Sequence, residues 1–302
     1  MCLFPIKARR CPYTGRALFT PDGDFQVSCG KCIPCLKLRA FHWGTRAKHE
    51  MSMHSSNCFL TLTYDEEHLP GKLICKNTFA KFIKRLRKHA KKKIRYMVSH
   101  EYGSRTLRPH HHLIVFGWEP RDLQFLKKSK SGYPLFTSRE LSKLWKLGHH
   151  SIGEANEKTA YYLAAYALKN QKTEVLSTDG ELTSFHDTFN CSTNPGIGKL
   201  YFEKNYKQLI DSGEILPRYY SKLLQKLDPH WACIYEEKQM QKFKDVGPSQ
   251  MYAKYEIEKQ NQQRSDGEFR SAPGLTQRDH YQRSYLKERA RRQHDYENNN
   301  SL

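Results

Sequence analysis

The alternation of apolar and polar positions predicts strands in the first half of the chain. In CFLTLTY, which begins at position 58, Phe59, Thr61 and Thr63 would share one face and the intervening residues the other, because successive side chains of a strand point to opposite faces. Further strands are expected at 94–100 and through LIVF at 113–116. The LIVF run is apolar on both faces, which is typical of a central strand in a covered sheet.

Apolar residues at helical spacing predict helices around these strands. Phe79, Phe82 and Leu86 recur every three or four positions among lysines and arginines, so this segment is expected to form a basic amphipathic helix that begins near Asn77 or Thr78. Other helices are expected at 36–53, 119–128, 138–147, 157–169, 199–210 and 219–227, with a connection at 148–153. This order of elements predicts an α+β fold in which helices flank an antiparallel sheet with a central His-x-His strand.

Composition divides the chain into four expected segments. These are a Cys-rich segment at 1–55, a core domain at 56–170, a helical extension at 171–246 and a polar, basic tail at 247–302. The tail has few large apolar residues and is expected to be disordered, as a nucleic-acid contact without chemistry of its own.

The net charge indicates the kind of partner. The chain has 51 Lys and Arg residues against 31 Asp and Glu residues, a net charge of +20. Such an excess favours a polyanion, with nucleic acid as the leading candidate and an anionic membrane surface as a distant second. No apolar run approaches the roughly 20 residues that span a bilayer, so a soluble intracellular protein is expected.

Nine cysteines include the spacing C-x2-C-x2-C. In a reducing compartment this spacing indicates a metal site before it indicates disulfides. The thiolates of Cys11, Cys29, Cys32 and Cys35 could bind a structural Zn2+. The alternative is a set of free thiols in a reduced loop, because zinc sites usually have two separate C-x2-C pairs.

Two histidines on the apolar strand form a second candidate metal site. His110 and His112 are two residues apart, so in a strand both imidazoles point to the same face and could converge on one ion. His111 would face the opposite way, as an ordinary half-buried histidine, unless the register of the strand differs.

Tyr162, Tyr166 and Lys169 would lie in one row on the predicted helix 157–169, because residues three and four apart share a helical face. The simplest interpretation is that the two tyrosines pack the helix on the sheet. In a basic chain with a histidine pair upstream, they also fit nucleophilic attack on a DNA phosphate that a divalent cation polarises.

Several motifs, taken together in their order, resemble a known family. They are FLTLTYDEEHLP at 59–70, EYG at 101–103, RPHHHLIVFG at 108–117, LWKLGHHSIG at 144–153, YYLAAYALK at 161–169, and CGKCIPC at 29–35 followed by Arg39 and Trp43. The chain resembles the HUH endonucleases that initiate rolling-circle replication, and more closely the gokushovirus-type initiators of the Microviridae, which are small single-stranded DNA phages. This resemblance implies an HUH nuclease core of the ferredoxin or RRM-like kind within 56–170.

The resemblance implies roles for particular residues. His110 and His112 would be the metal-binding pair of the HUH motif, and Glu101 would be a third ligand for Mg2+ or Mn2+. The family usually has a bulky apolar or aromatic residue between the two histidines, and His111 departs from that pattern. Tyr162 and Tyr166 would alternate as nucleophiles that form 5′-phosphotyrosine intermediates.

The remaining residues implied in the site are basic. Lys169 would orient the phosphate or stabilise a phenolate, although a lysine near a helix C-terminus also complements the helix dipole. Arg105, Arg108 and the basic helix at 79–93 are candidates for phosphate contacts, while a Lys-rich helix face can also simply be solvated.

The resemblance also implies a setting. The expected substrate is single-stranded origin DNA within supercoiled circular phage DNA, in the cytoplasm of a bacterial host and without a membrane partner. The chain has no G-x4-G-K-[ST] motif, so a host helicase is expected to unwind the DNA, with host polymerase and single-strand-binding protein as further partners. The alternatives are a plasmid initiator, a relaxase or a two-tyrosine transposase, or a zinc-containing nucleic-acid-binding protein without catalysis.

Overall fold

The computed structural model describes residues 2–69, 76–102, 108–129, 131–166, 172–176, 182–186 and 188–246. The chain divides into two compact units, one formed by Met1–Arg39 with Ala232–Leu302 and the other by Ala40–Trp231. The tail expected at 247–302 lies outside the described residues. The division into four segments stays a prediction.

The larger unit contains an antiparallel sheet of seven strands among the described residues, in the order β12-β5-β6-β4-β9-β8-β7. The strands are β4 (Asn57–Thr63), β5 (Arg95–Tyr102), β6 (Pro109–Phe116), β7 (Gln124–Lys128), β8 (Pro134–Thr137), β9 (His150–Glu154) and β12 (Thr188–Cys191), and a separate hairpin pairs β10 (Lys172–Leu176) with β11 (Leu182–His186). β6 carries His110 and His112 and has a strand on each side. The predicted α+β fold with an antiparallel sheet is therefore confirmed.

Helices accompany both units. They are α1 (Ile33–Met51), α2 (Lys76–Ala90), α3 (Arg139–Leu144), α4 (Glu157–Tyr166), α5 (Lys199–Asp211), α6 (Arg218–Leu227) and α7 (Pro229–Val246). Among the described residues, no helix combines the length and the apolar character that a membrane crossing requires.

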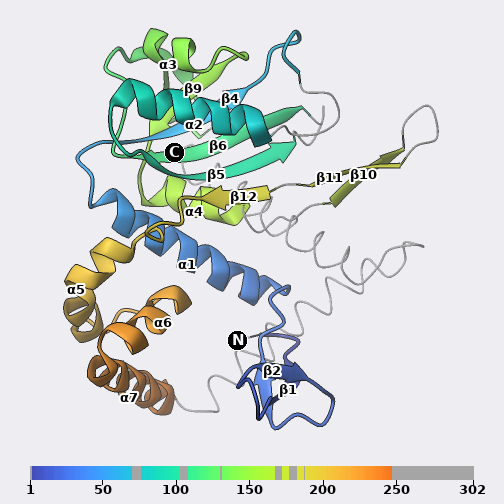
Figure 1. Ribbon diagram of the computed structural model, residues 1–302, viewed down its shortest axis with the longest axis vertical. Helices are drawn as coiled ribbons and strands as arrows, with labels where there is room; N and C mark the ends of the chain where they lie inside the picture. Colours follow the sequence, from blue (N-terminus) through green and yellow to red (C-terminus); the bar gives the residue numbers. More distant parts are fainter. Residues whose placement is uncertain are drawn as a thin grey trace. The chain divides into compact units, whose positions relative to one another are not determined.

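Both faces of the sheet are covered, and the pleat sorts the side chains between them. One core contains Leu60, Leu113 and Val115 together with the predicted apolar stripe of α2, which lies across the sheet (Figure 1). The other contains Phe59 and Ile114 with residues of α1 and α4. Adjacent residues of β4 and β6 thus enter different cores, as the alternation of the sequence predicts.

Two expectations for local structure were wrong. Segment 119–128 was expected to be helical, but it contains β7, whose five residues are all exposed. An edge strand of this kind has no buried side to impose an alternating pattern. The expected connection 148–153 contains most of β9, in which Ile152 is the one buried residue. Its strand character comes from pairing with β4, which a five-residue sequence pattern cannot show.

The N-terminal part of the smaller unit forms a three-stranded antiparallel sheet. Its strands are β1 (Ile6–Arg10), β2 (Ala17–Phe19) and β3 (Phe25–Val27), in the order β2-β1-β3. The strands are short and mostly exposed; Ala8 is the one fully enclosed residue within them. This sheet therefore has little apolar core of its own.

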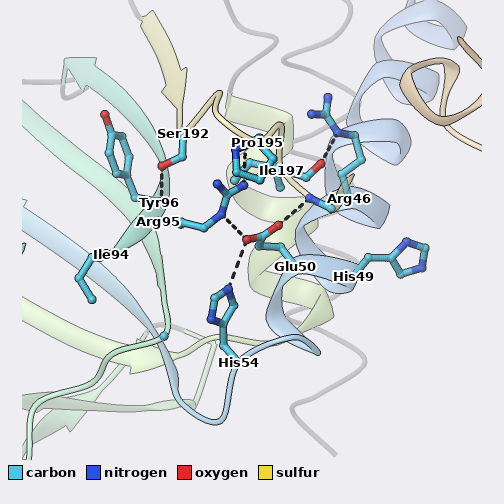
Figure 2. Close-up of polar contacts among 12 residues, drawn as sticks. Arg46, His49, Glu50, His54, Ile94, Arg95, Tyr96, Ser192, Pro195 and Ile197 are labelled. Carbon is cyan, nitrogen blue, oxygen red and sulfur yellow. Dashed lines mark hydrogen bonds and ion pairs between the residues drawn. The ribbon is translucent and has the colours of Figure 1, made fainter. Parts of the chain in front are cut away.

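A buried ion pair joins α1 to the central sheet in the larger unit. Glu50 and Arg95 are 3% and 6% exposed, and the guanidinium of Arg95 donates a hydrogen bond to the Glu50 carboxylate. The same carboxylate accepts from the backbone N–H of Gly198 at 2.7 Å and contacts His54 at 3.3 Å. Figure 2 shows Glu50 between these partners, with Arg95 also donating to the carbonyl of Pro195 at 2.8 Å. One carboxylate thus connects three segments.

Replacing Glu50 with Gln should strongly destabilise the protein, because it leaves the buried Arg95 guanidinium without a counter-charge. We expect a loss of about 3–5 kcal/mol in the free energy of unfolding, measured by urea denaturation. Glu203→Gln is the control, because it removes a partly exposed ion pair with Lys199 and should cost less than about 1 kcal/mol. Equal losses in the two variants would contradict the importance assigned to the buried pair.

His49 should make stability depend on pH. Burial lowers its pKa from 6.5 to about 4, with a further lowering by Lys48 that Glu157 opposes. Its ring stacks on Tyr201 and lies 3.2 Å from the Tyr220 hydroxyl. Between pH 6.5 and 4 the unfolded chain binds a proton that the folded chain does not, so the unfolding free energy falls as the pH falls, by about 3 kcal/mol over this window.

The variant His49→Gln should lose less stability than wild type between pH 7 and pH 4.5, in urea denaturation at each pH. His68→Gln is the matched control, because its exposed imidazole contacts Asp65 at the surface. If His49→Gln and wild type show the same pH dependence, the buried histidine does not contribute it.

Candidate functional site: a histidine pair and a tyrosine helix

Cross-strand pairing of β5 and β6 brings together a carboxylate and two imidazoles. Glu101 lies directly opposite His110, and Ser99 opposite His112. The potential ligand atoms of Glu101, His110 and His112 all lie within 4.8 Å of one another. Glu101 is 2% exposed, whereas both histidines are half-buried. The three residues that the sequence singled out as ligands are therefore neighbours on one face of the sheet.

Hydrogen bonds at Nδ1 orient both imidazoles. Nδ1 of His110 lies 3.1 Å from the carbonyl oxygen of Arg108, and Nδ1 of His112 lies 3.0 Å from the hydroxyl of Thr61. Metal-ligating histidines are usually held in this way, with Nε2 as the ligand atom. One carboxylate and two imidazoles form a donor set that suits a divalent cation with open coordination positions. The residues present therefore fit Mg2+ or Mn2+.

Helix α4 places Tyr162 next to the histidine pair. The ring of Tyr162 packs edge-on against those of His112 and Phe59, at centroid distances of 6.0 and 6.1 Å. Tyr162 is 42% exposed, so solvent reaches it. Tyr166 is the last residue of α4, and Lys169 lies outside the described residues.

A close contact with α1 positions this helix. The ring of Tyr161 lies over Gly44, where an added Cβ would come within 2.5 Å of the ring. Phe41 packs near the same ring at 6.5 Å, and the hydroxyl of Thr45 lies 3.5 Å from that of Tyr161. A glycine at position 44 thus lets the two helices approach, and Tyr161 points away from the histidine pair as the helical periodicity predicts.

The middle histidine lies on the opposite face of the sheet. His111 is fully buried, with Nε2 at 2.9 Å from the hydroxyl of Tyr64 and Nδ1 at 2.8 Å from Nδ1 of His100. Burial, followed by the nearby His100, His110 and His112, lowers the pKa of His111 well below its usual value. His111 is therefore a neutral core residue with polar partners, and the strand register expected from the sequence is correct.

The predicted phosphate-binding residues have a different distribution. Arg108 donates to the carbonyl of Tyr64 and forms an ion pair with Glu66 at 2.6 Å, so it ties down the turn after β4. Arg105 lies outside the described residues. The basic helix α2 covers the face of the sheet opposite the histidine pair. The structure therefore does not bring α2 to this site.

The cysteines form a separate cluster in the smaller unit, with one change from the expected set. The sulfur atoms of Cys2, Cys29, Cys32 and Cys35 lie within 4.8 Å of one another. Cys11, which the sequence-based set included, is not in this group. It lies in the turn after β1, where hydrogen bonds to Thr14 and Tyr13 lower its pKa. The turn between β1 and β2 keeps Cys11 apart, whereas the two ends of the three-stranded sheet meet at Cys2 and Cys29.

Sequence reasoning missed three residues that shape these sites. Thr61 and Phe59 face the site from β4, and their alternation with buried leucines was visible in the sequence without indicating contact with His112. Cys2 gave no signal, because it stands outside any recognisable spacing.

The chain was compared with known proteins. A family model for phage-type replication-associated proteins, described by its member ORF2, matches residues 57–171, which include Glu101, the histidine pair and α4. No solved structure matches the chain.

Three similar proteins come from phages. The replication-associated protein VP4 of Bdellovibrio phage phiMH2K is 31% identical over 271 residues, which cover 82% of this chain and 85% of that protein. The replication-associated protein ORF2 of Spiroplasma virus 4 is 34% identical, over 63% of this chain and 61% of that protein. ORF4 of Chlamydia phage 1, also a replication-associated protein, is 32% identical over 68% of this chain and 55% of that protein. The chain belongs to this family of phage replication-associated proteins.

Proposed function

We propose that this protein is a metal-dependent, site-specific single-strand DNA endonuclease and strand transferase that initiates and terminates rolling-circle replication. The observation that carries the proposal is the convergence of Glu101, His110 and His112 within 4.8 Å beside Tyr162 of α4. The family of the chain and its net charge of +20 support a role on DNA.

The first step is transesterification at a DNA phosphate. A bound Mg2+ or Mn2+ would polarise the phosphate and stabilise the leaving oxygen. The phenol oxygen of Tyr162 attacks phosphorus and loses its proton to solvent, which reaches this exposed side chain. The bond from phosphorus to the 3′-oxygen breaks, and that oxygen takes up a proton. The products are a free 3′-hydroxyl and a 5′-phosphotyrosine.

A second tyrosine allows the cycle to end. After one round of synthesis, Tyr166 would cleave the regenerated origin, and the released 3′-hydroxyl would attack the first phosphotyrosine. That attack forms a phosphodiester, frees Tyr162 and closes a DNA circle. Lys169 would orient the phosphate, and Arg105 and Arg108 would contact the DNA backbone.

The substrate is single-stranded origin DNA, exposed in supercoiled circular phage DNA. Because the chain has no P-loop motif, a host helicase would separate the strands, and host polymerase and single-strand-binding protein would act on the nicked product. These encounters would take place in the cytoplasm of the bacterial host.

The nucleophiles can be tested by trapping the covalent intermediate. Full-length protein is incubated with Mn2+ and single-stranded oligonucleotides that tile the genome encoding it, and then run on a denaturing gel. An oligonucleotide labelled at its 3′ end should move with the protein, and the same sequence labelled at its 5′ end should not, because the tyrosine retains the 5′-phosphate. Tyr162→Phe/Tyr166→Phe should form no adduct, because both phenol oxygens are gone.

Tyr161→Phe is the matched control for this experiment. It removes a phenol oxygen from the same helix, one that faces Thr45 instead of the histidine pair, and should form the adduct as wild type does. An adduct in the double variant would refute these nucleophiles. DNA that is bound but remains uncut with wild-type protein would favour the zinc-containing binding protein without catalysis.

The metal site can be tested without catalysis. Binding of Mn2+ to the full-length protein, followed by the electron paramagnetic resonance signal of the free ion, should weaken at least about tenfold in His110→Ala and in His112→Ala, because each removes a ligand. His89→Ala is the control, since this histidine of α2 contacts Glu140. Unchanged Mn2+ affinity in both site variants would exclude the proposed ligands.

A further inference from the structure

We propose that Cys2, Cys29, Cys32 and Cys35 bind one structural Zn2+ that closes the N-terminal sheet. This site is separate from the histidine pair and does not depend on the proposed nuclease activity. The fourth ligand is Cys2, next to the first residue of the chain, and Cys11 has no part in the site.

The spacing of the sulfur atoms suits a single ion. Tetrahedral Zn2+ with bonds of about 2.3 Å to sulfur requires sulfurs roughly 3.8 Å apart. The sulfur of Cys32 lies 3.8 Å from that of Cys2 and 3.4 Å from that of Cys35, and all four sulfurs lie within 4.8 Å of one another. A disulfide would pair two of the four at about 2.05 Å, whereas here Cys32 has two sulfur neighbours at similar distances.

Backbone amides already point at these sulfurs. The N–H groups of Lys31 and Cys32 donate to the sulfur of Cys29, both at 3.4 Å. The N–H of Cys29 donates to Cys2 at 3.2 Å, and that of Leu3 donates to Cys32 at 3.4 Å. Such donors stabilise thiolates, which are the form that binds metal. Four thiolates in a tetrahedral arrangement select Zn2+ or iron over harder cations.

The compactness of the group favours Zn2+ over an iron–sulfur cluster. In a cluster, the cysteines bind different irons and lie farther apart than ligands that share one ion. Four sulfurs within 4.8 Å leave room for one metal atom.

The position of the site in the chain explains what the ion does. Cys2 and Cys29 are 27 residues apart and lie on either side of all three strands of the small sheet. In the described residues 2–39, the buried apolar side chains are Leu3, Ala8 and Cys32. So few buried residues are insufficient to stabilise a sheet of this size, and a metal that joins its two ends supplies the missing constraint.

The test measures metal in the full-length, untagged protein, purified without added zinc. Elemental analysis should find about one Zn2+ per chain, held against a chromophoric chelator. Cys2→Ser should release its zinc to the chelator at least about tenfold faster, because one thiolate is lost. Replacement of zinc by Co2+ should give the visible and near-ultraviolet bands of a tetrahedral thiolate site in wild type, with reduced intensity in Cys2→Ser.

Two controls make the result specific. Cys11→Ser removes a thiol from the same part of the chain and should retain zinc as wild type does. His110→Ala should also retain it, which separates this ion from the proposed nuclease metal. Absence of zinc from wild type, iron in its place, or loss of zinc in Cys11→Ser with retention in Cys2→Ser would each overturn the proposal.

Discussion

The pleat of β6 determines where every chemically important histidine lies. Successive side chains of a strand alternate between faces, and both faces of this sheet are covered. His110 and His112 therefore meet Glu101 on the α4 side, while His111 enters the opposite core and contacts Tyr64 and His100. A shift of one residue in register would exchange these environments. The closely packed apolar residues of the same strand make such a shift costly, so core packing also maintains the candidate site.

Burial changes along β6 in a way that suits a site for a large substrate. On the α4 face, Ile114 and Phe116 are fully buried, whereas His110 and His112 are half-buried. The ordered core thus ends where the histidine pair begins, and Tyr162 stands at the same boundary with 42% exposure. Rigid support on one side and solvent on the other allow a DNA strand to approach without unfolding the sheet.

The sequence was most informative where burial imposes a period. The strand containing Phe59, the stripe of α2 and the helix containing Tyr162 all appeared in the pattern, and so did the facing of the histidine pair. β7 and β9 could not be predicted, because their strand character comes from partners and not from their own side chains. Cys2 was missed for a similar reason: its neighbours are 27 or more residues away, and the turns of a small sheet bring them together.

The buried ion pair of Glu50 and Arg95 connects the fold to the candidate chemistry. Arg95 begins β5, and Glu101 lies six residues later on the same strand. Glu50 lies on α1, the helix whose Gly44 receives the ring of Tyr161 and thereby positions α4. The strand that supplies the carboxylate and the helix that supports the tyrosine are thus joined by one charge pair, which is buried where water cannot weaken it. The distance between Tyr162 and the histidine pair therefore depends on a contact that takes no part in the chemistry.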